Sequence, residues 1–132
     1  MENIKKYFKN DKFAEYSGIE LIDVSKGRAK AKLEIKEHHL NSAKVVHGGA
    51  IFTLADLAFA VASNSHGTSA LSINVSISYL KAAKDGFLIA EAKEISLNHK
   101  LASYSVQVTD EKDNIIAIFQ GMVYRKNCSI DS

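Results

Sequence analysis

One segment of this chain is apolar or small at almost every position, and its length is that of a helix. It runs from Gly49 to Ser63, interrupted by a single acid. The pattern predicts a helix over residues 49–65, with Gly67 as its stop. Because this helix is apolar nearly all round, we expect it to be buried rather than to lie on the surface.

Other segments alternate between apolar and polar residues with the period of two that strands show. Residues 4–16 indicate one or two short helices, and residues 19–24 and 28–35 a hairpin. After the long helix, strands are expected over residues 71–79, 87–97, 103–109 and 115–124. The order predicts an α+β fold in which an antiparallel sheet wraps around one long central helix.

The strand expected over residues 71–79 has a polar face without any charge. Its apolar positions alternate with Ser72, Asn74, Ser76 and Ser78. A face of small uncharged residues is less hydrated than one of Lys and Arg. It indicates a central strand, a subunit contact or the wall of a site.

Composition narrows the class of protein. The 132 residues fit a single domain over residues 1–132, with an N-terminal helical segment at 1–16 and a tail at 127–132. The formal charge is only +2, and basic residues are interleaved with acids, so no nucleic-acid-binding stripe is expected. No apolar run is long enough to span a bilayer, and the N-terminus is too polar for a signal peptide. With Cys128 as the only cysteine, the sequence predicts a cytoplasmic protein without an internal disulfide.

A single carboxylate, Asp56, lies in the middle of the apolar helix. No Lys or Arg on the helix is available to pair with it. One interpretation is structural, in which Asp56 faces a solvent channel or is satisfied by a hydroxyl or amide from a strand. The other is functional, in which a general base or nucleophile is held in an apolar cleft that raises its basicity.

The helix is preceded by His47, Gly48 and Gly49. The first amides of a helix have no intrahelical partner and carry the positive end of its dipole, and glycine leaves them open to a ligand. Such a helix start can polarise a carbonyl and hold an oxyanion, although two glycines also simply make a tight turn.

The spacing of these groups predicts an oligomer. Gly48 and Asp56 are eight residues apart, which separates them by roughly 12 Å along one helix axis. A reacting carbon must lie about 3 Å from both groups, so one helix cannot supply both. Two antiparallel copies can, and if both groups act on one carbonyl the protein is at least a dimer with two shared sites.

These motifs resemble a known family. HGGAIFTLAD followed by LAFAVASNSHG, with Asn41 upstream and SINVSISYLK and GMVYRK downstream, is similar to the hotdog-fold acyl-CoA thioesterases. The similarity is to the phenylacetate-pathway (PaaI-like) branch of the 4-hydroxybenzoyl-CoA thioesterase superfamily, and it covers roughly residues 13–126. It implies a hotdog fold, dimers with a continuous sheet that often form tetramers, and no cofactor beyond the coenzyme A of the substrate.

The resemblance also implies roles for individual residues. Asp56 would activate a water or attack the thioester carbonyl, and the backbone N–H of Gly48 would polarise that carbonyl. His47 and Asn41 would shape the pocket, and Ser72 would place a hydroxyl near the water. The residues expected to bind substrate are Gly49, Phe52, Phe59, Lys81, Lys84, Asn98 and Lys100.

Two places in the chain depart from the family pattern. Lys81-Ala82 stands where Arg-Pro is common, and Asn98-His99-Lys100 stands at a turn where Gly-Arg-Arg or Gly-Lys-like residues are common. The lysines keep positive charge where the family binds coenzyme A phosphates. The remaining histidines lack metal-ligand spacing and are typical of surface or loop, so no metal is expected.

The sequence therefore predicts hydrolysis of a medium-chain or aromatic acyl-CoA, with Phe52 and Phe59 either lining the acyl pocket or belonging to the core. The uncharged face of residues 72–78 favours a tetramer. One alternative is a non-catalytic acyl-CoA binding or sensing module, in which Asp56 would have no purpose. The other is a hotdog hydratase or dehydratase, which needs a His facing the acid, whereas His47 precedes the glycines.

Overall fold

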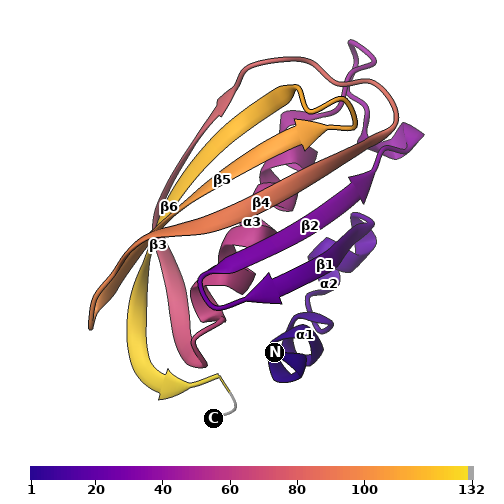
Figure 1. Ribbon diagram of the computed structural model, residues 1–132. Helices are drawn as coiled ribbons and strands as arrows, with labels where there is room; N and C mark the ends of the chain where they lie inside the picture. The colour runs from indigo at the N-terminus through magenta and orange to yellow at the C-terminus, as the bar shows by residue number, and fades with distance from the viewer. Residues whose placement is uncertain (131–132) are drawn as a thin grey trace.

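A computed structural model describes residues 1–130, in which an antiparallel sheet wraps around one long helix (Figure 1). The elements are α1 (Glu2–Phe8), α2 (Lys12–Tyr16), β1 (Ile19–Ser25), β2 (Arg28–Glu34), a 3₁₀ turn η1 (Glu37–His39), α3 (Gly48–Asn64), β3 (Thr68–Tyr79), β4 (Phe87–Leu97), β5 (Leu101–Asp110) and β6 (Ile115–Ser129). The strands form one six-stranded sheet in the order β1-β2-β4-β5-β6-β3. The predicted α+β architecture is confirmed.

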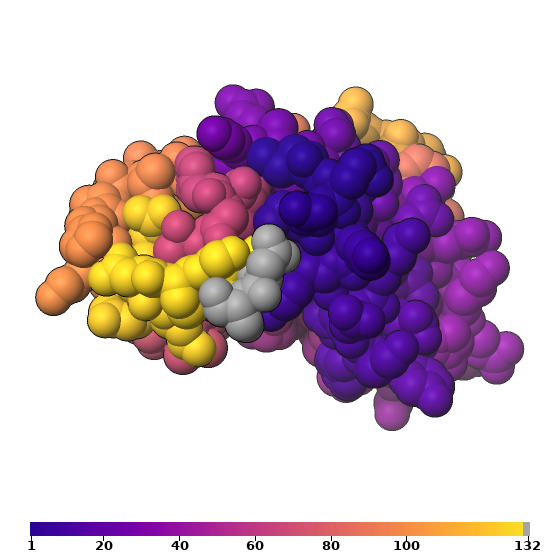
Figure 2. All heavy atoms as spheres, turned by 90° about the horizontal axis from the view of Figure 1, so that it is seen from below, coloured from indigo at the N-terminus to yellow at the C-terminus, as the bar shows by residue number. Residues whose placement is uncertain are grey.

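The N-terminal segment forms two short helices, as the sequence predicts. The carboxylate of Asp11 separates them, because it caps α2 by accepting a hydrogen bond from the Ala14 N–H at 3.0 Å. Both helices contact α3 and β1. Seen from below, the segment occupies the middle of the surface, drawn in indigo in Figure 2.

The long helix α3 is buried except along one face. It begins at Gly48, one residue earlier than predicted, and ends at Asn64. Its interior-facing residues, such as Leu54 and Ala58, are fully buried against the sheet. Apart from Gly48 and Ala50 in the first turn, the residues left at least partly exposed follow helical spacing, and we call them the α3 stripe: Gly49, Phe52, Thr53, Asp56 and Ala60.

Strand β3 lies at the edge of the sheet and pairs only with β6. Of the three interpretations of its uncharged face, the protomer excludes the central strand and leaves the subunit contact and the site wall. A β-bulge between Ser72 and Asn74 also breaks the predicted alternation. Leu71 pairs with the exposed Tyr124 and is itself 54% exposed, whereas Val75 packs against the core. The predicted alternation is wrong here because the extra residue of a bulge shifts every later side chain by one.

Strand β6 continues beyond its predicted end at residue 124, so residues 127–129 of the expected tail belong to a strand. Ile130 is buried, and its N–H donates to the carbonyl of Gly67 at 3.1 Å. Residues 131–132 of the predicted tail lie outside the described residues.

The two ends of α3 lie at opposite ends of the sheet. At the Gly48 end of the protomer, α3 begins beside the last residue of β3, Tyr79. At the Ser65 end, the N–H of Gly27 in the β1–β2 turn donates to Ser65 Oγ at 2.7 Å. Among the described residues, no helix is both long and apolar enough to cross a membrane.

Candidate active site

The start of α3 presents one open backbone donor. His47 caps the helix, and its Nδ1 accepts a hydrogen bond from the Gly49 N–H at 2.8 Å. The next amides, those of Ala50 and Ile51, donate to the His47 carbonyl. Within residues 1–130 the N–H of Gly48 has no acceptor. The cap therefore satisfies the neighbouring amides and leaves that of Gly48 open, at the positive end of the helix.

Tyr79 packs over this helix start. Its hydroxyl donates to the Gly48 carbonyl at 3.0 Å. A Cβ added at residue 48 would lie 3.2 Å from Tyr79 Cζ, which gives Gly48 a packing reason to be glycine as well as a chemical one. A groove of about 400 Å³ runs alongside, lined by Ile51, Tyr79 and Lys81 among others. Sequence reasoning missed Tyr79, because an aromatic residue in an alternating strand reads as ordinary core.

Asp56 lies two turns further along α3, in the α3 stripe. Its side chain is partly buried, and no donor among the described residues pairs with it. Burial raises the pKa of Asp56 above that of an ordinary aspartate, and the negative charge of Asp11 raises it further. A carboxylate in this state is a stronger base than one on an open surface.

Within one protomer, Asp56 and the Gly48 amide cannot act on the same atom. The helix is continuous from Gly48 to Asn64, so the separation of roughly 12 Å along its axis is retained. A reacting carbon reaches about 3 Å from each group. If both groups act on one carbonyl, one of them must therefore come from a second chain.

Asn41 organises the loop that leads into α3. Its Oδ1 accepts hydrogen bonds from the N–H groups of Ala43 at 2.9 Å and Val45 at 3.3 Å. Lys44, between them, has a positive φ of 62°. In the protomer, Asn41 thus fixes the approach to His47.

The two predicted pocket phenylalanines differ in position. Phe59 is 1% exposed, and its ring packs against those of Phe119 and Tyr104. Gly121 makes room for it, because a Cβ there would lie 2.5 Å from Phe59 Cζ. Phe52 lies in the α3 stripe and is only partly buried. The structure places Phe59 in the core and leaves Phe52 within reach of a ligand.

Ser72 lies on the exposed edge strand. It pairs in register with the buried Val123, so its side chain points to the face of the sheet that covers α3.

The predicted coenzyme A-binding residues fall at opposite ends of the protomer. Lys81 and Lys84 follow β3 at the Gly48 end. Asn98 and Lys100 form the β4–β5 turn at the Ser65 end, where Asn98 Oδ1 accepts from the N–H of Lys100 at 3.2 Å. All four are exposed. They can contact one ligand together only if two chains contribute to the same site.

Comparison with known proteins identifies the family. The profile of the thioesterase superfamily matches residues 43–117, which include the α3 stripe and both groups of the proposed site. This chain belongs to the thioesterase superfamily.

Individual relatives and solved structures show which branch of the superfamily this chain resembles. A protein of Archaeoglobus fulgidus whose name proposes an esterase is 50% identical over 96% of this chain and 84% of its own. The structure of Escherichia coli PaaI, from the phenylacetic acid degradation operon, matches with a TM-score of 0.93 and 29% identity, covering 97% of this chain and 94% of that one. A Streptococcus mutans structure with bound acetyl-CoA matches with a TM-score of 0.78 and 27% identity over 82% of this chain and 88% of its own. The resemblance to PaaI-like hotdog thioesterases is confirmed, and the protein is a thioester hydrolase.

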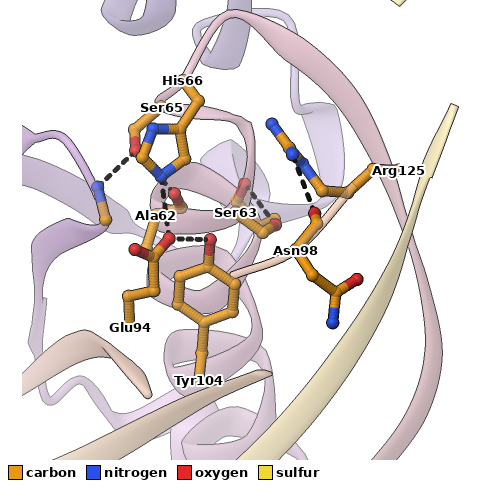
Figure 3. Close-up of polar contacts among 10 residues, drawn as sticks. Ala62, Ser63, Ser65, His66, Glu94, Asn98, Tyr104 and Arg125 are labelled. Atoms are coloured by element: carbon orange, nitrogen blue, oxygen red, sulfur yellow. Dashed lines mark hydrogen bonds and ion pairs between the residues drawn. The ribbon is translucent and has the colours of Figure 1, made fainter. Parts of the chain in front are cut away.

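The thioesterase also contains a polar cluster that the sequence did not predict, at the Ser65 end of the protomer (Figure 3). His66 Nε2 lies 2.7 Å from Glu94 Oε1, and the Tyr104 hydroxyl donates to the same oxygen at 2.7 Å. Burial by itself raises the pKa of Glu94, but the hydrogen bonds from His66 and Tyr104 outweigh it, so the pKa lies below the ordinary value. Because the three residues come from separate elements, no local motif could have revealed the cluster.

His39 corrects the expectation that the remaining histidines lie on the surface or in loops. It is 4% exposed and lies in η1. Its Nδ1 accepts from the Lys36 N–H at 2.9 Å and its Nε2 donates to the Ser17 carbonyl at 2.7 Å, which fixes η1 to the end of α2. No group of three metal-ligating side chains occurs among the described residues.

Proposed function

We propose that this thioesterase hydrolyses a medium-chain or aromatic acyl-CoA to the free acid and coenzyme A. The observation that carries the proposal is the pair formed by the open Gly48 amide and the unpaired Asp56 carboxylate on one helix. The E. coli relative is named acyl-coenzyme A thioesterase PaaI, and the S. mutans neighbour was solved with acetyl-CoA, which supports a coenzyme A thioester as substrate. No cofactor is required, because a thiolate leaves readily and needs little acid assistance.

Two unpartnered features of the protomer support a dimer. One edge of β3 has no neighbouring strand within the described chain, and proteins normally cover such an edge. The α3 stripe is likewise left open beside it. Antiparallel pairing of β3 with β3 of a second copy would continue the sheet and lay the two α3 helices antiparallel. Asp56 then faces Gly48 of the partner subunit, and the uncharged outer residues Ser76 and Ser78 favour a further pairing into a tetramer.

In this site the thioester carbonyl oxygen accepts a hydrogen bond from the Gly48 N–H of the partner subunit. The Asp56 carboxylate removes a proton from water as the water oxygen bonds to the carbonyl carbon. The negative charge that develops on the carbonyl oxygen is stabilised by the same N–H. The C–S bond then breaks, and the departing thiolate takes the proton from Asp56. In the alternative route, Asp56 attacks the carbon itself and water hydrolyses the resulting anhydride.

Thiol release from short, medium, long and aromatic acyl-CoA compounds tests this proposal, with Asp56→Ala beside the wild type. The variant is expected to fold and assemble normally and to lose about 10²–10⁴ in kcat. Asp85→Ala, which removes an exposed carboxylate from a loop, is the control and should keep full activity. Asp56→Asn is a less clean variant, because deamidation can restore the acid. Full turnover by correctly assembled Asp56→Ala would remove Asp56 from the mechanism, and ligand-dependent thermal stabilisation without thiol release would favour the binding-module alternative.

A further inference from the structure

A second groove lies between the N-terminal helices, β1 and α3, and we call it the N-terminal groove. It measures about 380 Å³, within the range of roughly 300–1,000 Å³ found for small-molecule pockets. Its lining is apolar at Phe8, Ala14, Ile19, Leu21 and Leu57. Phe8, Ile19 and Leu21 are only partly buried, so apolar surface is left open for a ligand to cover.

The inner wall of the groove lies level with the proposed catalytic carboxylate. Leu57 follows Asp56 on α3, about 1.5 Å further along the axis and about 100° around it. Asp11 lines the other side of the groove, close enough for its charge to raise the pKa of Asp56. Asp56 itself does not line the groove, but it stands at the same level of α3 as Leu57, which does.

The charged residues of the groove are also compatible with a ligand whose apolar tail lies in the groove. The charged residues that line the groove are Lys5, Lys9, Asp11, Glu15 and Glu20. A ligand with an apolar tail would cover the lining and leave these charged groups at the edge. The groove beside Gly48 is different, because Lys81 gives it a cation suited to the phosphate-bearing end of the substrate.

We propose that the N-terminal groove binds the acyl group of the substrate while the thioester carbonyl lies at Asp56. The N-terminal helices are then the specificity element of the enzyme, and Phe8 sets how much acyl chain fits. This inference rests on the function proposed above and adds to it the place where the acyl group is bound and selected.

The experiment compares the chain-length profile of kcat/KM, from acetyl-CoA to hexadecanoyl-CoA and including phenylacetyl-CoA, for variants at two phenylalanines. Phe8→Trp, which fills the groove, should lower kcat/KM for the best wild-type substrate at least about tenfold and leave acetyl-CoA nearly unchanged. Phe8→Ala, which lengthens the groove, should move the optimum to longer chains. Phe13→Ala is the matched control, because Phe13 lies on α2, is 70% exposed and does not line the groove, and its profile should coincide with that of the wild type.

Identical profiles for wild type and both Phe8 variants, or a uniform change for all substrates, would overturn the inference while leaving hydrolysis itself established. If a Phe8 variant fails to fold, Leu21→Phe narrows the groove from β1 and should give the result expected for Phe8→Trp. A readout without catalysis separates the two proposals. Calorimetric binding of octanoate and phenylacetate to wild type should be weakened by Phe8→Trp, even if the wild type were to release no thiol from any acyl-CoA. Unchanged binding would count against the groove.

Discussion

Gly48 meets two requirements at one position. The ring of Tyr79 packs on its Cα, and its amide is the one at the helix start that His47 does not satisfy. The packing of Tyr79 and the open amide both favour glycine at position 48. A variant that changes one without the other is needed to separate the two requirements. Because Gly48 is the first residue of α3, proline offers that separation.

Replacing Gly48 with proline should remove the donor and keep the helix. Proline is well accepted at the first helical position, and His47 already has the extended backbone, with ψ of 136°, that precedes proline comfortably. Gly48→Pro is expected to lower kcat for acyl-CoA hydrolysis about 10²–10³-fold, the usual effect of losing one oxyanion donor. Gly48→Ala adds a Cβ against Tyr79 but keeps the N–H, so it should retain most of the activity. Equal losses in the two variants would point to crowding by the Cβ.

Asp56 should make activity and stability respond to pH in opposite directions. Its pKa is raised in the folded state, so the fold favours the protonated form. The stabilising contribution is present below the unfolded-state pKa of about 3.9 and is lost as the pH rises through the higher folded value. Activity needs the ionised form, and we therefore expect kcat/KM to fall as the pH drops through that raised pKa.

The stability half of this prediction is measured by the Tm of wild type and Asp56→Ala between pH 4 and pH 8. The variant should gain most on the wild type near neutral pH, and the gain should shrink toward pH 4. A better helix former at position 56 shifts Tm equally at every pH, so only the pH-dependent part reports the carboxylate. A difference that does not change with pH would contradict a raised pKa.

At the scale of elements, the sequence predicted the structure well wherever one pattern, an apolar run or a strict alternation, continued through the whole element. The apolar run predicted α3 to within one residue at either end, and alternation predicted the positions of β1, β2, β4 and β5. It failed at the β3 bulge, because a bulge inserts a residue without any composition signal. It could not reveal His39 as a buried residue, since the partners of that ring are backbone groups of Lys36 and, far along the chain, Ser17.

The candidate site divides in the same way. The identity and spacing of Gly48 and Asp56 could be deduced from the sequence, because both lie on one predictable helix. Which amide stays open depends on the rotamer of His47, and the contact of Tyr79 with Gly48 depends on how β3 ends. Both features depend on tertiary structure, so they could not be predicted from the sequence.

Glu94 joins the end of α3 to the sheet, so its replacement should lower the free energy of unfolding of the whole protomer. It binds His66 after α3 and Tyr104 on β5 from the middle of β4. Glu94→Gln should lower the free energy of unfolding by about 1.5 kcal/mol at pH 7, the low end for hydrogen bonds to a charged group, because the Glu94 side chain is 25% exposed.

Urea unfolding checks this against Glu91→Gln, which removes a carboxylate from the outer face of the same strand and should change little. The pKa of Glu94 is lowered, so its contribution is present above the unfolded value of about 4.3 and is lost as the pH falls through the folded one. The two variants should therefore converge in acid. Equal stability of Glu94→Gln and Glu91→Gln at pH 7 would show that the cluster is not a stabilising junction.

At the scale of the whole molecule, one strand edge and one helix face of the protomer lack a covering partner. Among the described residues the open edge of β3 has no strand partner and the α3 stripe is left uncovered, and Asp56 lies roughly 12 Å from the Gly48 amide along one helix. Lys81 and Lys84 at the Gly48 end are likewise separated from Lys100 of the β4–β5 turn. The two-fold dimer proposed above would resolve all of these, and it would then be part of the chemistry as well as of the fold.

Mixing two inactive variants tests this arrangement directly. In a heterodimer of Asp56→Ala and Gly48→Pro chains, one site combines the intact Asp56 of one chain with the intact Gly48 of the other, and the second site has neither. Random reassociation forms heterodimers in about half of the molecules, so the mixture should recover about a quarter of wild-type kcat, although each variant alone is nearly inactive. Thiol release is measured after co-refolding, with each variant refolded alone as the control. If each site were built within a single chain, every site in the mixture would still lack one group and no activity would return, so recovery of the expected fraction requires that the amide and the carboxylate come from different chains.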